Sequence, residues 1–218
     1  MAFIALAFSF VAALAQDKPV PSAAPQLLSE ISLDLDGDGI SDRVALVLTG
    51  SSGTVEKRDD GSYRLNDGES VDLFFYMHNG DKTLDLSARA TFVKKNVLGI
   101  TNVSLLETVF PLAQRGKAAV AFHSCYGCSA SISWDETLTL VSRNQQFLVA
   151  GYGRSWFTNT HPNPPAEDIS SGRCDINFLT GKGLAANDIE AQVKPLKQKF
   201  HLIKLADWSR ENSPADCN

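Results

Sequence analysis

The sequence has 218 residues, of which 44% are apolar and 21% are charged, and its formal net charge is −5 at pH 7. This composition is typical of a globular protein and excludes a disordered tail or a fibre. The acidic balance argues against a nucleic-acid binder, because such proteins usually carry a basic face.

The N-terminal segment Met1–Ala15 is apolar, carries no charged side chain and ends in the triplet Ala-Leu-Ala. Small residues at the first and third positions of such a triplet suit signal peptidase. An anchor helix is the alternative, but the segment is short for a hydrocarbon layer of about 30 Å. We therefore expect a signal peptide over residues 1–15, a Pro/Ala-rich linker over 16–29, and a periplasmic or secreted protein. No later apolar run has the length of a membrane span, so we expect none in the mature chain.

An acidic loop with the pattern D-x-D-x-D-G-x-x-D occupies residues 34–42. Calcium takes about six to eight oxygen ligands, and alternate carboxylates around a tight turn converge on one point. An acidic surface turn without a metal is the alternative, but carboxylates this close together repel one another. We therefore expect a calcium ion here, with Gly39 supplying the turn. The expected ligands are the carboxylates of Asp34, Asp36, Asp38 and Asp42 and the carbonyl oxygen of Ile40.

This loop, with the apolar strand Val44–Leu48 directly after it, resembles the calcium loop of FG-GAP and integrin-type repeats. In that family the acidic positions bind calcium, which implies the same role for the matching aspartates here. Those proteins repeat the unit around a propeller, whereas this chain has one copy, so the resemblance does not imply a propeller. An EF-hand is excluded, because Ala45 stands where its bidentate Glu would be and a strand follows. The remainder loosely resembles uncharacterised exported bacterial proteins, which implies no activity.

Strand patterns recur along the rest of the chain. Val44–Leu48 is apolar throughout, which predicts a strand buried on both faces. Asn79-Gly80 lies between two alternating segments and favours a hairpin in which Phe75 pairs with Leu84. Further strands are predicted at 101–108, 118–125, 136–142, 146–153, 174–179 and 199–205. We expect one mainly β domain over residues 30–218, with a mostly antiparallel, sandwich-like sheet and little helix.

The chain contains four cysteines, Cys125, Cys128, Cys174 and Cys217, an even number that predicts disulfides in an exported protein. We expect Cys125–Cys128 and Cys174–Cys217, because the second bond would tie the C-terminus to the body. A thioredoxin-type motif at Cys125 should begin a helix, but its flanks are strand-like. A zinc site needs two close pairs, which the wide spacing of the last two cysteines does not provide.

Three weaker candidate sites involve groups that titrate or stack. His123 and Cys125 fall on one face of a strand, as a Cys–His nucleophile requires. Trp134 next to Asp135 and Glu136 is a combination found in sugar-binding sites. The last is a group of Tyr152, Trp156 and Phe157, which would be interface anchors if they were exposed, although packing of two of the three into the core is favoured. The other histidines, His78, His161 and His201, show no metal-ligating spacing.

Two classes of function fit these observations. The first is an exported, non-enzymatic calcium-binding β protein that recognises another protein or an envelope component, as an inhibitor does. The alternative is an envelope hydrolase that acts on glycan or peptide with acids such as Asp135 or Glu136. A hydrolase brings two titratable groups into one cleft, and no motif here predicts such a pair. The sequence therefore favours the binding protein, and it identifies neither the target nor the oligomeric state.

Overall fold

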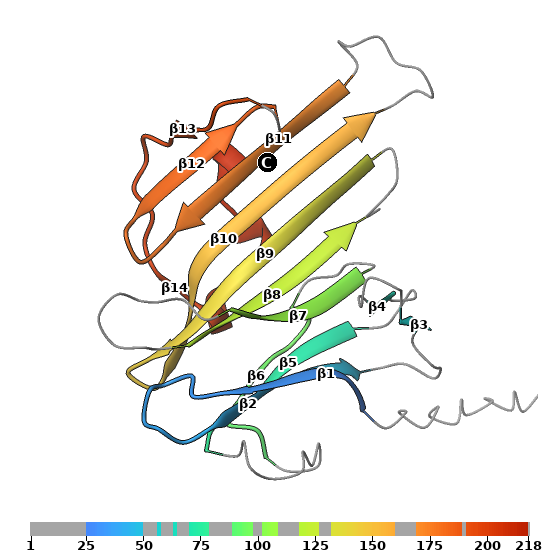
Figure 1. Ribbon diagram of the computed structural model, residues 1–218, viewed down its shortest axis with the longest axis vertical. Coiled ribbons are helices and arrows are strands. Elements are labelled where there is room, and N and C mark those ends of the chain that lie inside the picture. The colour runs from blue at the N-terminus through green and yellow to red at the C-terminus, as the bar shows by residue number, and fades with distance from the viewer. Residues whose placement is uncertain are drawn as a thin grey trace, which may run out of the picture.

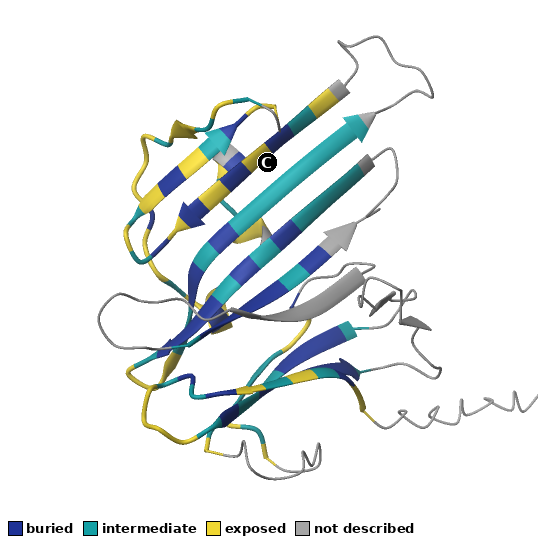
Figure 2. Cartoon of the chain, viewed as in Figure 1, coloured by how far each residue is buried: buried dark blue, intermediate teal, exposed yellow. Residues whose placement is uncertain are grey.

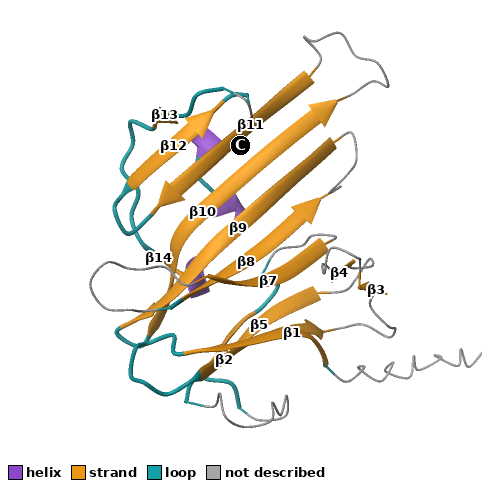
Figure 3. Ribbon diagram, in the orientation of Figure 1, coloured by secondary structure: helices purple, strands orange, loops and turns teal. Residues whose placement is uncertain are grey.

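The computed structural model describes residues 25–49, 56–57, 63–64, 70–78, 89–97, 102–108, 118–126, 132–159, 169–188 and 191–217. The expected signal peptide and Cys128 lie outside these residues, as does the side chain of Cys125. Regular structure in the described part consists of β-strands and short 3₁₀-helices (Figure 3), which confirms the prediction of a mainly β protein. Within the same part, no helix has the length and apolar character needed to cross a membrane.

The strands form two antiparallel sheets (Figure 1). The four-stranded sheet has the order β1 (Gln26–Leu33), β2 (Asp42–Thr49), β5 (Ser70–Tyr76), β6 (Phe92–Lys94). The ten-stranded sheet has the order β13 (Lys194–Pro195), β12 (Lys182–Ala186), β11 (Ile169–Asn177), β10 (Gln146–Asn159), β9 (Ile132–Arg143), β8 (Ala119–Tyr126), β7 (Asn102–Thr108), β4 (Tyr63–Arg64), β3 (Glu56–Lys57). The tenth strand, β14 (Ile203–Lys204), pairs with β10 outside this order. It is followed by the 3₁₀-helices η2 (Leu205–Asp207), η3 (Arg210–Asn212) and η4 (Ala215–Cys217).

The two sheets pack face to face over one apolar core, as the sandwich prediction requires. In β2 the residues Val44–Leu48 are buried on both faces (Figure 2). Val44 and its alternate neighbours join the core between the sheets, whereas Ala45 and Val47 pack against Tyr76 on the other face. Across the core, the rings of Phe75 and Phe147 lie 4.3 Å apart and join the two sheets directly.

Two sequence predictions about the smaller sheet are wrong. Phe75 pairs with Phe92 and not with Leu84, because β5 lies between β2 and β6 and both of its edges are occupied. The ring contact between Phe75 and Phe92, at 5.8 Å, favours this register. β1 begins at Gln26, inside the expected linker, and a register shift near Leu27 breaks the regular alternation that would have revealed this strand.

The C-terminal segment, residues 203–217, packs against β10 and β11 and contributes to the core on the inner face of the ten-stranded sheet. The predicted strand at 199–205 is wrong except for β14, because the chain turns into η2 and places Leu205 and Trp208 in the core. The disulfide between Cys174 and Cys217 confirms the predicted bond, with 5.4 Å between the Cα atoms. Cys125–Cys128 stays a prediction.

We expect loss of the Cys174–Cys217 bond to lower the free energy of unfolding by about 2–5 kcal/mol, because the unfolded chain gains conformational freedom. Denaturant unfolding of the double variant Cys174→Ala/Cys217→Ala against the wild-type protein measures this cost. A double variant as stable as wild type would contradict the bond's structural role, as would reactive thiols at both positions in the unreduced protein.

Candidate metal centre

The acidic loop between β1 and β2 is organised around the carboxylate of Asp34. This carboxylate accepts hydrogen bonds from the backbone N–H groups of Gly37 at 2.7 Å, Asp38 at 3.1 Å and Gly39 at 2.9 Å. Gly37 and Gly39 have φ angles of 81° and 87°, in the left-handed region that glycine adopts without strain. Carboxylates that bond to backbone groups a few residues ahead stabilise turns of this kind. The loop is therefore curled by its own sequence.

Asp42, the first residue of β2, ties the loop to the neighbouring strand. Its side chain is buried and accepts hydrogen bonds from the N–H groups of Leu35 and His78, both at 2.8 Å. Burial raises the pKa of Asp42 above its ordinary value, the two hydrogen bonds oppose that shift, and the negative charge of Asp36 adds to it. A cation next to Asp42 would offset both the burial and the repulsion.

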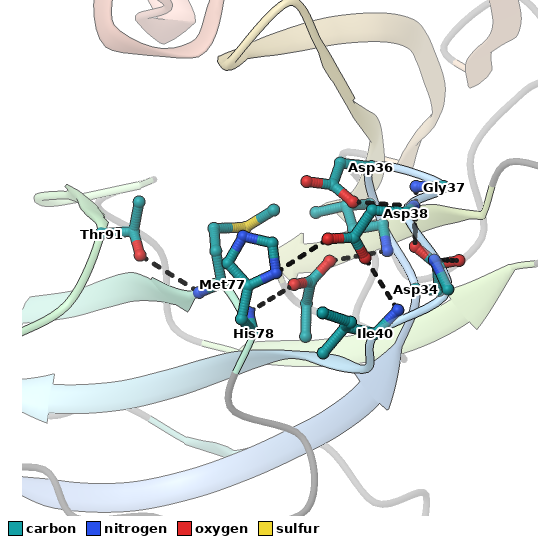
Figure 4. Close-up of polar contacts among 11 residues, drawn as sticks. Asp34, Asp36, Gly37, Asp38, Ile40, Met77, His78 and Thr91 are labelled. Atoms are coloured by element: carbon teal, nitrogen blue, oxygen red, sulfur yellow. Dashed lines mark hydrogen bonds and ion pairs between the residues drawn. The ribbon is translucent and has the colours of Figure 1, made fainter.

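His78 is a member of the site that sequence reasoning missed. Its Nδ1 lies 2.9 Å from the Oδ2 atom of Asp38 (Figure 4), and its own φ angle of 57° turns the chain at the end of β5. The next residue back, Met77, donates its N–H to Thr91. The pairing of Arg43 with Tyr76 brings the end of β5 beside the start of β2, so only the sheet register could have revealed this neighbour.

Two overlapping groups of side chains could hold a metal ion. One oxygen each of Asp34, Asp36 and Asp42 lie within 4.8 Å of one another, and the same holds for ligand atoms of Asp36, Asp38 and His78. The first group offers only oxygen, which suits calcium, whereas an imidazole suits zinc and other transition metals better. The predicted carboxylates are therefore brought together; the role of the Ile40 carbonyl stays a prediction.

The two acids proposed for a hydrolase do not share a cleft. Asp135 contacts the hydroxyl group of Ser155, whereas Glu136 is buried and accepts a hydrogen bond from the Tyr152 hydroxyl at 2.9 Å. Adjacent residues in a strand point to opposite faces, so the ten-stranded sheet separates these carboxylates. The two candidate acids of the hydrolase alternative thus lie on opposite faces of the sheet, and the hydrolase stays a hypothesis.

Arg154 connects the buried Glu136 to the C-terminus. Its Nε lies 3.7 Å from Glu136 Oε1, and its Nη1 donates a hydrogen bond to the carbonyl oxygen of Cys217 at 2.9 Å. Its guanidinium group lies 5.9 Å from the ring centres of both Trp134 and Trp156. This arrangement holds the C-terminal segment against the sheet from the inside.

The remaining sequence candidates do not assemble into one site within the described residues. His123 on β8 pairs with Thr137 on β9, and position 125 pairs with Asp135. Because the side chain of Cys125 lies outside the described residues, a Cys–His pair stays a hypothesis. Tyr152 is buried and lies beside Trp208, whereas Trp156 pairs with Trp134 in the sheet register. Phe157 occupies the opposite face of β10 from these two side chains, and both Trp156 and Phe157 are half-buried.

A groove on the outer face of the ten-stranded sheet was not predicted. It encloses about 320 Å³ above Gly151 and Gly153, with Thr137 and Thr139 on one side and Asp175 on the other. Although Asp175 is exposed as a residue, partial burial of its carboxyl group against the groove walls raises its pKa. Polar groups thus line a concave surface on the opposite side of the sheet from Arg154.

Comparison of the chain with protein-family models, with curated proteins and with solved structures finds no match.

We expect Arg154→Met to lower the free energy of unfolding by about 3–5 kcal/mol, because it leaves the buried carboxylate of Glu136 without its cation. Adding Glu136→Gln should recover part of that loss, and a double-mutant cycle in denaturant measures the coupling. If the single variant lost less than about 1 kcal/mol, the pair would not hold the C-terminal segment.

We expect Asp175→Asn to stabilise the protein at neutral pH, because the folded state disfavours the ionised carboxyl group. The native state binds the proton more tightly than the unfolded chain, so wild-type stability falls as pH rises through the ordinary Asp pKa of about 3.9 towards the raised value. The advantage of the variant should therefore disappear at lower pH. Melting temperatures across this pH range measure it, and a variant less stable than wild type at pH 7 would contradict the assignment.

Proposed function

We propose that this protein is an exported, non-enzymatic calcium-binding β protein that recognises a partner in or outside the cell envelope. The observation that carries the proposal is the convergence of Asp34, Asp36 and Asp42, whose oxygen atoms lie within 4.8 Å of one another at the start of a core strand. Carboxylates at this separation repel one another unless a cation lies between them. The resemblance of the loop to FG-GAP calcium loops supports the same ion.

The position of the loop favours a structural ion over a regulatory one. Asp42 begins β2, and its hydrogen bonds reach both Leu35 in the loop and His78 after β5. An ion held by the loop would therefore fix three segments of the smaller sheet relative to one another. A single loop beside a fully packed strand has no obvious hinge to open.

The Cys174–Cys217 disulfide is compatible with export, because disulfides persist in oxidising compartments. Partner recognition is favoured over hydrolysis because Glu136 is buried and bonded to Tyr152, whereas Asp135 contacts Ser155 on the opposite face of the sheet.

We expect calcium to raise the melting temperature by about 5–10 °C. An ion at about 100 times its dissociation constant stabilises the native state by about 2.7 kcal/mol, which for a chain of this size gives such a shift. Calorimetric scans in calcium and in chelator measure the difference. Asp36→Ala should abolish it, whereas Glu211→Ala, which changes an exposed acid on η3, should leave it intact. Equal melting temperatures of wild type in both solutions would refute the calcium site.

Which metal ion the site prefers depends on which of the two overlapping groups of side chains holds it. His78→Asn keeps a residue type that tolerates the left-handed conformation and removes the imidazole. If calcium is held by the all-oxygen group, this variant should bind calcium within about threefold of wild type by titration calorimetry. Loss of calcium binding in this variant would assign the ion to Asp36, Asp38 and His78. A preference of the wild-type protein for zinc over calcium would contradict a calcium protein.

A further inference from the structure

Strands β12 and β13 lie at one end of the ten-stranded sheet (Figure 1). A cationic groove lies there. It encloses about 850 Å³ between residues 178–184 and 195–202. Lys182, Lys197, Lys199 and His201 line it, and none of its lining residues is acidic. The sequence from 191 to 204 likewise contains no Asp or Glu. A chain with net charge −5 thus presents one locally positive end.

The same groove exposes apolar side chains. Leu184 is 42% exposed and Leu202 is 41% exposed, and both line the groove. Among the described residues only Leu27 and Ile40 are comparable large apolar side chains left open to solvent, and neither lies here. Figure 2 shows the mixture of exposed and buried positions along β12. Leucine side chains next to unpaired lysines form an amphipathic surface.

The base of the groove is rigidly built. The N–H of Leu196 donates to the carbonyl of Gly183 at 2.8 Å, and the N–H of Phe200 donates to the carbonyl of Gly181 at 3.3 Å. A Cβ atom at Gly183 would lie 2.7 Å from the Phe200 ring, so these segments are in close contact. Phe200 packs edge-on against Phe178 in the core. The two segments that line the groove are therefore fixed relative to one another.

We propose that this groove docks the protein on a membrane surface that contains anionic lipids. No ion pair engages Lys182, Lys197 or Lys199 within the described part of the chain, so their charges are available to lipid headgroups. A lysine near such a surface contributes about 1 kcal/mol, or about fivefold in affinity. Leu184 and Leu202 add apolar contact at the headgroup boundary, while the acidic remainder of the molecule is repelled and orients this end towards the lipid. A soluble anion would use the lysines but would gain little from the outward-facing leucines.

Co-sedimentation with vesicles tests the proposal, using phosphatidylcholine alone and phosphatidylcholine mixed with phosphatidylglycerol. All solutions contain chelator, so the result does not depend on the calcium site. The full chain is used throughout, because the apolar segment Met1–Ala15 is common to all variants and does not respond to lipid charge. We expect wild type to bind the mixed vesicles more tightly, and to lose this preference as salt is raised.

Variants then locate the contact. Lys197→Glu should lower the affinity for mixed vesicles about fivefold or more, whereas Lys95→Glu, the same charge change at an exposed lysine outside the groove, should not. Leu202→Gln should weaken binding without removing the preference for anionic lipid. Equal losses from Lys197→Glu and Lys95→Glu would overturn the proposal. So would unchanged binding of Leu202→Gln together with tighter binding to soluble polyglutamate, since the partner would then be an acidic polypeptide.

Discussion

Strand β2 is covered by apolar side chains on both of its faces, and this double burial determines where its neighbours lie. Val44 and Leu46 are buried against the larger sheet on one face, and Val47 is buried against Tyr76 on the other. A strand of this kind cannot be at an edge, so it pairs with β1 and β5 at once. The acidic loop that precedes β2 is thereby carried to the rim of the core, where Asp42 is already buried. The metal centre we propose is a consequence of that placement.

The second half of the molecule obeys a different constraint. The ten-stranded sheet is longer than the four-stranded sheet can cover, and an uncovered apolar face is unfavourable in water. The C-terminal segment supplies the missing layer through Leu205 and Trp208, held by the disulfide and by Arg154. Lys197, Lys199 and Leu202 of the cationic groove directly precede this segment, whereas Lys182 and Leu184 lie on β12. The layer that completes the core is thus continuous with part of the surface we propose for lipid.

Much of the smaller sheet's centre could be predicted, because an uninterrupted apolar run and a dense acidic loop are local signals. The pairing of β5 with β6 could not, since Leu84 and Phe92 are both plausible partners for Phe75 until ring packing decides between them. Strand alternation also places Asp135 and Glu136 on opposite faces, which is another local signal. The absence of acids between 191 and 204 was likewise visible in the sequence, but only the fold shows which lysines share a groove.

A calcium ion that fixes the acidic loop against β2 and β5 should protect the amides of these segments. Amide hydrogen exchange measures that protection residue by residue. In calcium, protection from exchange should rise over residues 35–48 and at His78. The N–H groups of Gly37 and Gly39 bond to Asp34, those of Leu35 and His78 bond to Asp42, and the loop leads directly into β2. The rise should be larger there than in β9, β10 and β11, which belong to the other sheet and gain only from the stabilisation of the whole native state. Unchanged protection in the loop would contradict a calcium ion bound at this loop.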